Sequence, residues 1–372
     1  GFMPFGFLNA PIFQSLNPSI FLMPKNTPLA DLQPRPILVC QLKQIGDVIL
    51  ATPTLQLLKK RWPQAEIHVL TESKCAPVLE HHPALHTIWP IDKAALRPFW
   101  KALAYYRRVA GQGFDLIVDL QQLPRCKYVV ALSKAPVRLS YPPPWYNRPL
   151  YTHWAQPQHG YAARFKASFL APLGITWNDE RPRMALTREE RSWAEHFVRD
   201  KGLKAGERLI VAAPSHKAAN RRWPAANYGE VIRLAGQERP DWKWLLVYGP
   251  GERATAEAVR AAADNAPVLL PFEDIFDLRR IAALVDRADF FLGNCSAPRH
   301  MAVALDTPSL AVLGASSTAW TFPSPEHEDI ASGLSCQPCN EEGCRFDGVP
   351  CLRDLTALTV WQRLSQRFDL LS

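Results

Sequence analysis

An aspartate just after the first β pattern of the chain is the leading candidate for a functional side chain. Residues 37–42 (ILVCQL) form a short apolar run typical of a buried strand, and residues 46–62 then carry apolar side chains at helical spacing. Gly46 fits the turn between them because it has no Cβ to clash there. Asp47 falls in the first turn of the helix, at the carboxyl edge of the strand, where open α/β sheets bind ligands. Its carboxylate either contacts a bound ligand or only complements the helix dipole.

Three cations follow predicted strand ends near this aspartate: Lys43, Arg125 and Lys127. They could capture anionic groups of a substrate, or they could be ordinary solvated charges. Lys43 is the best placed of the three because it lies in the same turn as Asp47.

A second group that could do chemistry lies near the end of the chain. Cys336, Cys339, Cys344 and Cys351 fall within sixteen residues. The Cys-x2-Cys spacing lets two thiolates chelate one ion, and the other two could complete a tetrahedral Zn²⁺ or Fe site. Reduced structural thiols and disulfides are the alternatives. In each case we expect a structural role, since the cluster lacks the second-shell acids and the open position that metal catalysis needs.

Composition places these residues in a soluble α/β protein. A chain of 372 residues is too long for one ordinary core, so two domains are expected. The net charge of +8 favours an anionic partner, such as a phosphosugar, a nucleotide, a nucleic acid or an acidic membrane surface. No stretch reaches the length of apolar sequence that a spanning helix needs. Eight cysteines are too few for a disulfide scaffold of this size, which favours a reducing cytoplasm.

Two series of alternating strands and helices position the candidate residues. In the first half, strands are predicted at 37–42, 66–71, 86–91, 114–121 and 137–141, with a helix at 96–109. In the second half they are predicted at 208–214, 242–249, 267–270, 289–293 and 309–314. Alternation of this kind predicts parallel sheets with helices on both faces. Residues 141–154, rich in proline and aromatic residues, are expected to be a loop without secondary structure of its own.

The expected domain organisation has four parts. Residues 1–35 form a proline- and phenylalanine-rich arm, which packs on its own domain, on another subunit or on a membrane surface. Residues 36–180 and 181–352 form two Rossmann-like doubly wound domains facing a central cleft, and residues 353–372 form a final helix that reaches back to the first domain.

The first half resembles the ADP-heptose:lipopolysaccharide heptosyltransferases, glycosyltransferase family 9. The residues that carry the resemblance are Gly46 and Asp47 followed by Thr52 and Pro53 one turn on, and then the strand EIHVLT. The resemblance extends from about residue 36 to the C-terminus and implies the GT-B fold. It implies that Asp47 is the general base, with Lys43, Gly46, Arg125 and Lys127 on the acceptor side. An inverting transfer requires one such carboxylate and no covalent intermediate.

Two turns of the second half match the positions that hold the donor in this family. Arg221 and Arg222 precede Trp223-Pro224. The resemblance implies that Arg221 binds the phosphates of the donor and that its neighbour Arg222 could take its place. A guanidinium suits a diphosphate because it donates two parallel hydrogen bonds. Ser215 and Lys217 lie in the same loop and could add hydrogen-bond donors, or they could serve only as capping or surface residues. A loose resemblance places Glu252 on the ribose of the nucleotide, and its alternative role is that of a carboxylate at a helix N-terminus.

The third donor motif is a helix start after the strand DFFLG, where free N–H groups suit a diphosphate. It comprises Cys295, Ser296, Ala297, Pro298 and His300. Cys295 stands where the family has aspartate, Ala297 where it has glycine, and Asp306 where glycine precedes Thr-Pro. A thiol is a feeble hydrogen-bond acceptor, so this departure weakens donor binding or changes the donor sugar.

The resemblance therefore implies an inverting heptosyltransferase that acts on a lipopolysaccharide inner core or a similar envelope glycan. It needs no catalytic cofactor, and we expect it to be cytoplasmic, with peripheral contact to the anionic inner face of the bacterial inner membrane. The alternatives are another nucleotide sugar, a protein acceptor, or a degenerate protein that binds a sugar nucleotide without turnover. We expect no nucleic acid partner, because no basic recognition helix accompanies the cysteines.

Overall fold

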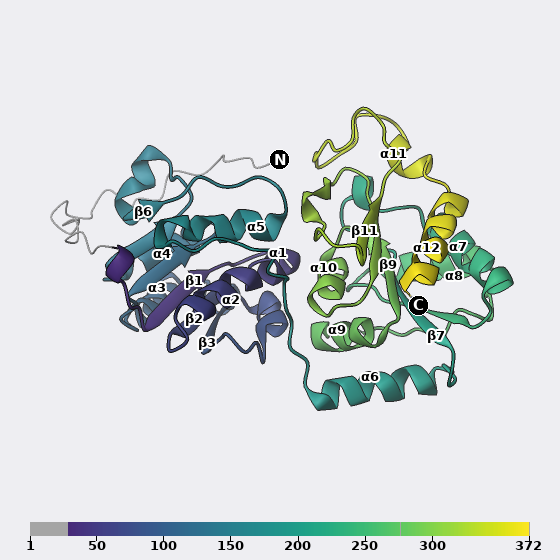
Figure 1. Ribbon diagram of the computed structural model, residues 1–372, viewed down its shortest axis with the longest axis horizontal. Helices are drawn as coiled ribbons and strands as arrows, with labels where there is room; N and C mark the ends of the chain where they lie inside the picture. The colour runs from purple at the N-terminus through teal and green to yellow at the C-terminus, as the bar shows by residue number, and fades with distance from the viewer. Residues whose placement is uncertain (1–28, 276, 372) are drawn as a thin grey trace.

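The computed structural model describes residues 29–275 and 277–371, and the first 28 residues of the expected arm lie outside this part of the chain. Two parallel sheets stand side by side (Figure 1). The first has the strand order β3-β2-β1-β4-β5-β6. Its strands are β1 (Pro36–Cys40), β2 (Glu66–Glu72), β3 (Thr87–Ile91), β4 (Leu116–Asp119), β5 (Val137–Ser140) and β6 (His153–Trp154).

Helices cover both faces of this first sheet because successive side chains of its central strand point to opposite sides. Ile37 and Val39 of β1 join one core cluster, whereas Leu38 and Cys40 join another. The first face is covered by α1 (Ile45–Ile49), α2 (Thr52–Arg61), η4 (Ser73–Leu79) and η6 (Ser168–Leu173), with η3 (Leu29–Asp31) packed on η6. The second face is covered by α3 (Phe99–Ala110), α4 (Pro124–Leu132) and η5 (Trp145–Leu150).

The second sheet has the order β11-β10-β9-β7-β8 and the same construction. Its strands are β7 (Arg208–Ala213), β8 (Trp242–Leu246), β9 (Phe290–Asn294), β10 (Ser309–Val312) and β11 (His327–Ile330). One face carries α6 (Arg188–Asp200), α9 (Leu278–Arg287) and α10 (Ala297–Ala304). The other carries α7 (Ala225–Glu238), α8 (Arg253–Ala262), α11 (Pro350–Arg353) and α12 (Ala357–Leu371). Short turns of 3-10 helix occur at η7 (Ala219–Arg221) and η8 (Thr318–Trp320).

The predicted pair of doubly wound sheets is confirmed, but three local expectations are wrong. Residues 267–270 make only an isolated bridge, Trp244 to Leu269, rather than a strand. Residues 141–154 are not a plain loop, because they include η5 and the edge strand β6. The final helix α12 does not reach back to the first sheet: it packs on α7, and its buried side chains join the core of the second sheet. The expected domain boundaries stay a prediction.

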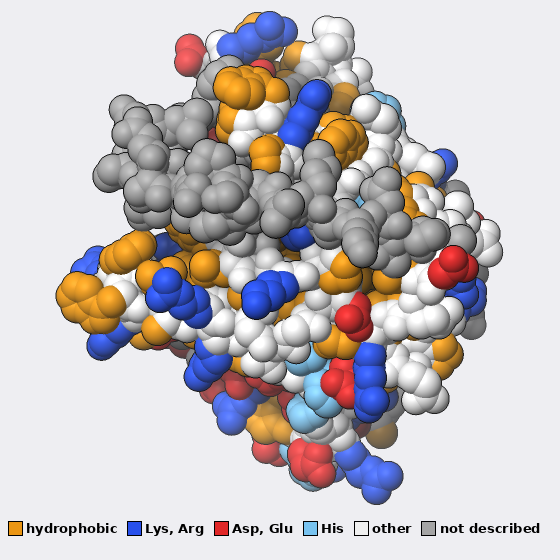
Figure 2. Space-filling view, turned by 90° about the vertical axis from the view of Figure 1, so that its left-hand side faces the viewer, with side chains coloured by type: hydrophobic (Ala, Val, Ile, Leu, Met, Phe, Trp, Pro, Cys, Tyr) orange, Lys and Arg blue, Asp and Glu red, His pale blue; other side chains and the backbone are white. Residues whose placement is uncertain are grey.

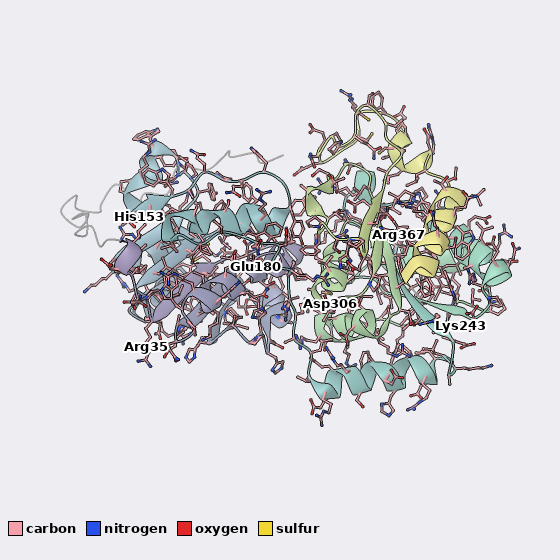
Figure 3. All side chains as sticks on the ribbon, viewed as in Figure 1. Arg35, His153, Glu180, Lys243, Asp306 and Arg367 are labelled. Carbon is pink, nitrogen blue, oxygen red and sulfur yellow. The ribbon has the colours of Figure 1, made fainter. Side chains whose placement is uncertain are left out.

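The two halves meet through α1, α5 (Ala162–Ala167) and α10, which lie between the sheets in Figure 1. Leu50 and Tyr161 of the first half pack with Val303 and Phe322 of the second in one buried cluster. Glu180 and Asp306, labelled in Figure 3, lie at this junction, and Asp306 forms an ion pair with Arg181. The helices described here are all too short or too polar to cross a bilayer.

Candidate active site

Asp47 lies where the sequence predicts, in the first turn of α1 immediately after β1. The backbone N–H of Gln44 donates to its Oδ2 at 3.3 Å. The Nζ of Lys166, from α5, lies 3.0 Å from its Oδ1 and also donates to Oε1 of Gln41 at 3.1 Å. The Lys166 side chain is 8% exposed and that of Asp47 is 27% exposed. The carboxylate is thus held by a buried cation and remains open on one side to a ligand.

Gly46 is required for a reason that the turn alone does not give. It lies inside α1, and a Cβ added to it would be 2.7 Å from Cδ2 of His300 and 3.4 Å from its Nε2. His300 belongs to α10 of the other half. The glycine therefore allows the two halves to approach closely beside Asp47, in addition to fitting the turn, and its predicted place on the acceptor side stays a prediction.

His300 brings an uncharged imidazole to this junction. Its side chain is buried, and burial lowers its pKa to about 3, with the nearby Arg299 and Lys166 acting in the same direction and Asp47 opposing them. Its Nδ1 is buried and has no hydrogen-bond partner within the described residues. A neutral ring beside the carboxylate can offer one nitrogen as donor or acceptor to a bound ligand.

The predicted phosphate site lies at the start of α10, and its role stays a prediction. Ser296 precedes the helix but makes no side-chain capping bond in the described chain. Pro298 has no N–H, and the N–H of Arg299 donates to the Ser296 carbonyl at 3.1 Å, so the capacity of this helix start to bind an anion rests on the N–H of Ala297. Ala297 and Pro298 form the first turn. Burial raises the pKa of the Cys295 thiol, and the thiol is therefore a neutral group at this helix start. Its hydrogen bond with Ser316 acts on the pKa in the opposite direction.

Asn294 is a positioning residue that sequence reasoning missed. It ends β9, is fully buried, and its Oδ1 accepts from the backbone N–H of Trp223 at 2.9 Å. Its Nδ2 donates to the carbonyl of Pro214 at 2.9 Å. It thereby fixes both ends of the predicted donor turn. The signal was a single amide closing the apolar run FFLGN.

Of the residues predicted to bind the donor, Ser215 and Glu252 bond to each other, whereas the three cations Lys217, Arg221 and Arg222 differ in exposure. Ser215 donates to Oε2 of Glu252 at 2.6 Å, and the N–H of Gly249 donates to the same oxygen at 2.8 Å. Lys217 and Arg222 are exposed. Arg221 is half-buried: its Nη2 donates to the carbonyl of Asn340 at 3.5 Å, and its Nε has no partner within the described residues.

The cations predicted to bind the acceptor lie on two different elements. The backbone N–H of Lys43 donates to Oε1 of Gln121 at 3.2 Å, which ties the turn before Asp47 to the end of β4. Arg125 and Lys127 lie on α4, where Arg125 bonds to Tyr106. Lys127 is partly buried, and burial lowers its pKa. Their predicted contact with an acceptor stays a prediction.

The four clustered cysteines are free thiols, as are all cysteines of the chain. Cys351 is buried at the start of α11, Cys336 is partly exposed, and Cys339 and Cys344 are exposed. Their sulfurs do not gather as a ligand set in the described part of the chain. As they stand they do not fit a tetrahedral ion, and we derive no step through a metal. The metal site stays a prediction.

Glu66, His68 and His86 do gather, with ligand atoms within 4.8 Å of one another. They lie where β2 and β3 begin, at the sheet edge opposite Asp47. Nε1 of Trp89 donates to Nδ1 of His68 at 3.0 Å. Because Nδ1 accepts this hydrogen bond, neutral His68 carries its proton on Nε2, and neither nitrogen has a free lone pair for a metal. A histidine that binds a metal uses one nitrogen as the ligand and donates a hydrogen bond from the other. The triad does not fit a metal either.

Residues 102–349 match the family model of glycosyltransferase family 9 (heptosyltransferase), which is more than half of the chain. The chain belongs to glycosyltransferase family 9. This glycosyltransferase is 25% identical over 279 residues to a lipopolysaccharide heptosyltransferase 3 of Escherichia coli, a match covering 73% of this chain and 81% of the relative.

Solved structures of similar fold come from the same family. The family 9 glycosyl transferase from Veillonella parvula DSM 2008 superposes with a TM-score of 0.78 at 23% identity, covering 91% of this chain and 98% of the other. The E. coli ADP-heptose lps heptosyltransferase II gives 0.73 at 18%, covering 89% and 98%. These likenesses confirm the predicted GT-B fold of the glycosyltransferase.

Proposed function

We propose that this glycosyltransferase moves a heptose from ADP-heptose to a sugar hydroxyl of a lipopolysaccharide inner core or a similar envelope glycan, with inversion at the anomeric carbon. The observation that carries the proposal is the position of Asp47. It is a partly exposed carboxylate at the carboxyl edge of β1, held by Lys166 and placed beside the start of α10 through the contact of Gly46 with His300.

Asp47 would act as the general base. Its oxygen takes the proton from the acceptor hydroxyl while that oxygen attacks the anomeric carbon, and the bond from this carbon to the ADP phosphate breaks. Lys166 and the Gln44 N–H fix the direction of the carboxylate, which is the contribution that orientation makes to such a step. No second carboxylate is needed as a nucleophile.

The donor would lie against the second sheet. The uncapped start of α10 and the Arg221 guanidinium suit the diphosphate and would stabilise the charge that develops on departing ADP. Lys43, beside Asp47, and the cations of α4 would favour an anionic acceptor. One of the solved structures of similar fold is the E. coli heptosyltransferase WaaC, which was determined with ADP-2-deoxy-2-fluoro heptose. This ligand supports ADP-heptose as the first donor to test.

The test offers the purified chain ADP-heptose and, separately, UDP-glucose, together with lipopolysaccharide that lacks its heptoses. We expect ADP release and an acceptor whose mass grows by one heptose, with ADP-heptose only. ADP-heptose that binds without either change would point instead to the non-catalytic alternative. Transfer from UDP-glucose alone would overturn the assigned donor.

A further inference from the structure

The positive charge of the chain is concentrated in one segment. Residues 94–165 contain ten Lys or Arg and two Asp or Glu, a net charge of +8 that equals the net charge of the whole chain. The rest of the chain contains 33 residues of each sign and is therefore neutral in sum. Only one of the two acids is removed from the surface. Asp119 is buried, and Asp115 accepts from the backbone N–H of Arg35.

Several cations of this segment are available to a partner. None of the ten forms an ion pair with a carboxylate in the described part of the chain. Arg97, Lys101, Arg107 and Lys134 are exposed, and so is Arg148. Such a group of unpaired charges attracts an anionic surface at long range.

Exposed aromatic side chains are interleaved with these cations. Trp145 is 79% exposed and Trp100 is 71% exposed, and Phe99, Tyr146 and Trp154 are exposed as well. The guanidinium of Arg148 lies 6.0 Å from the centre of the Trp154 ring. Large aromatic side chains left in water next to cations mark an interaction surface rather than a solvated face.

Both groups belong to one layer of the fold. The exposed members of both groups lie on or directly beside α3, α4, η5 and β6, and the buried sides of α3, α4 and η5 share one core cluster on the same face of the first sheet. Figure 2 looks onto this end of the molecule, whose upper and left parts carry orange and blue side chains, while red ones lie mainly lower down and to the right.

We propose that this layer, the basic aromatic face, docks the chain on an anionic lipid bilayer, with its tryptophans at headgroup level and its cations against the lipid phosphates. The proposal names the surface that would make the membrane contact expected of an enzyme with a lipid-linked acceptor. The reason for docking rests on the proposed function, whereas the docking itself does not. A second copy of this chain is a poorer occupant, because two faces of the same charge repel.

The experiment measures binding of the full chain to vesicles of phosphatidylethanolamine with and without phosphatidylglycerol. Binding is expected only with phosphatidylglycerol, and it is expected to be lost at high salt. Replacing three cations together, Arg97→Gln, Lys101→Gln and Arg148→Gln, is expected to weaken binding roughly a hundredfold, at about fivefold for each charge near the surface. Trp100→Ala with Trp145→Ala is expected to weaken it as well.

The matched control removes three exposed cations of the second half, Arg188→Gln, Arg199→Gln and Lys204→Gln, and is expected to bind like the native chain. Equal weakening by both triple variants would overturn the proposal, since it would reduce docking to total charge. A face that holds two copies together, or that binds RNA but not vesicles, would also overturn it. Transfer to a water-soluble acceptor is expected to be unchanged in every variant, so a failure of docking is distinguishable from a failure of the proposed transferase activity.

Discussion

Replacing Gly46 by alanine tests how closely the two halves must approach beside Asp47. The new Cβ would lie 2.7 Å from Cδ2 of His300, about 0.7 Å inside the ordinary van der Waals contact that begins at 3.4 Å. His300 cannot swing away freely, because it is buried and its ring lies 6.1 Å from that of Trp320. We therefore expect α1 and α10 to be pushed apart.

The size of the effect follows from this overlap. Overpacking a tight contact costs about 1–3 kcal/mol of unfolding free energy, which corresponds to a fall in Tm of roughly 1–4 °C for a chain of this size. Activity should suffer more, because a displacement near 1 Å at a reacting centre can lower the rate on the order of a hundredfold. The native backbone angles of Gly46 are helical, so alanine itself introduces no strain.

The assay pairs thermal unfolding with ADP release. Gly343→Ala is the matched control, since no atom lies within 4 Å of a Cβ added there. The double variant Gly46→Ala with His300→Ala should recover part of the lost stability, because the second change removes the ring that clashes. Native stability and native turnover in Gly46→Ala, or strictly additive losses in the double variant, would refute the proposed contact.

Three further results are expected. Lys166→Met breaks a largely buried ion pair and should cost about 3 kcal/mol of stability and most of the transfer rate while leaving donor binding intact; an unchanged Tm and rate would contradict this. Burial lowers the pKa of His82 to about 4 and those of His300 and His327 to about 3. The unfolded chain takes up these protons first, near pH 6.5, so the free energy of unfolding should be about 2 kcal/mol lower per histidine at pH 5 than at pH 7.5. Denaturant titrations that coincide at the two pH values would contradict this explanation. Cys295→Asp restores a carboxylate acceptor and should tighten binding of the donor about ten- to a hundredfold by calorimetry, whereas unchanged affinity would show that this position does not face the sugar.

The sequence was sufficient to place the elements whose pattern is local. The strand before Asp47 and the helical stretch after it follow from apolar spacing, and so do β7 and β9 beside the donor turns, whereas α10 follows from the family resemblance. Residues 267–270 show the limit: they meet the free edge of β8 at the single bridge of Leu269 with Trp244, and a four-residue apolar run does not tell whether such pairing extends into a strand.

Contacts between distant segments could not be predicted in this way. Lys166 is separated from Gln41, which it contacts, by 125 residues, and its own helix shows no feature that marks it as a partner of Asp47. The role of Gly46 likewise depends on how closely α10 approaches, which is a property of the assembled halves. Asn294 was visible only as a polar residue at a strand end, and its two backbone partners became evident with the fold.

The most direct test of the central role given to Asp47 is the rate of heptose transfer by Asp47→Asn in a single turnover, with ADP-heptose already bound. The amide keeps the size of the side chain but cannot accept the acceptor's proton, so the rate should fall on the order of a hundred- to ten-thousandfold while the Kd for ADP-heptose stays near that of the native chain. Asp200→Asn, on the exposed end of α6, should behave as the native chain does. Transfer by Asp47→Asn at close to the native rate would contradict the mechanism.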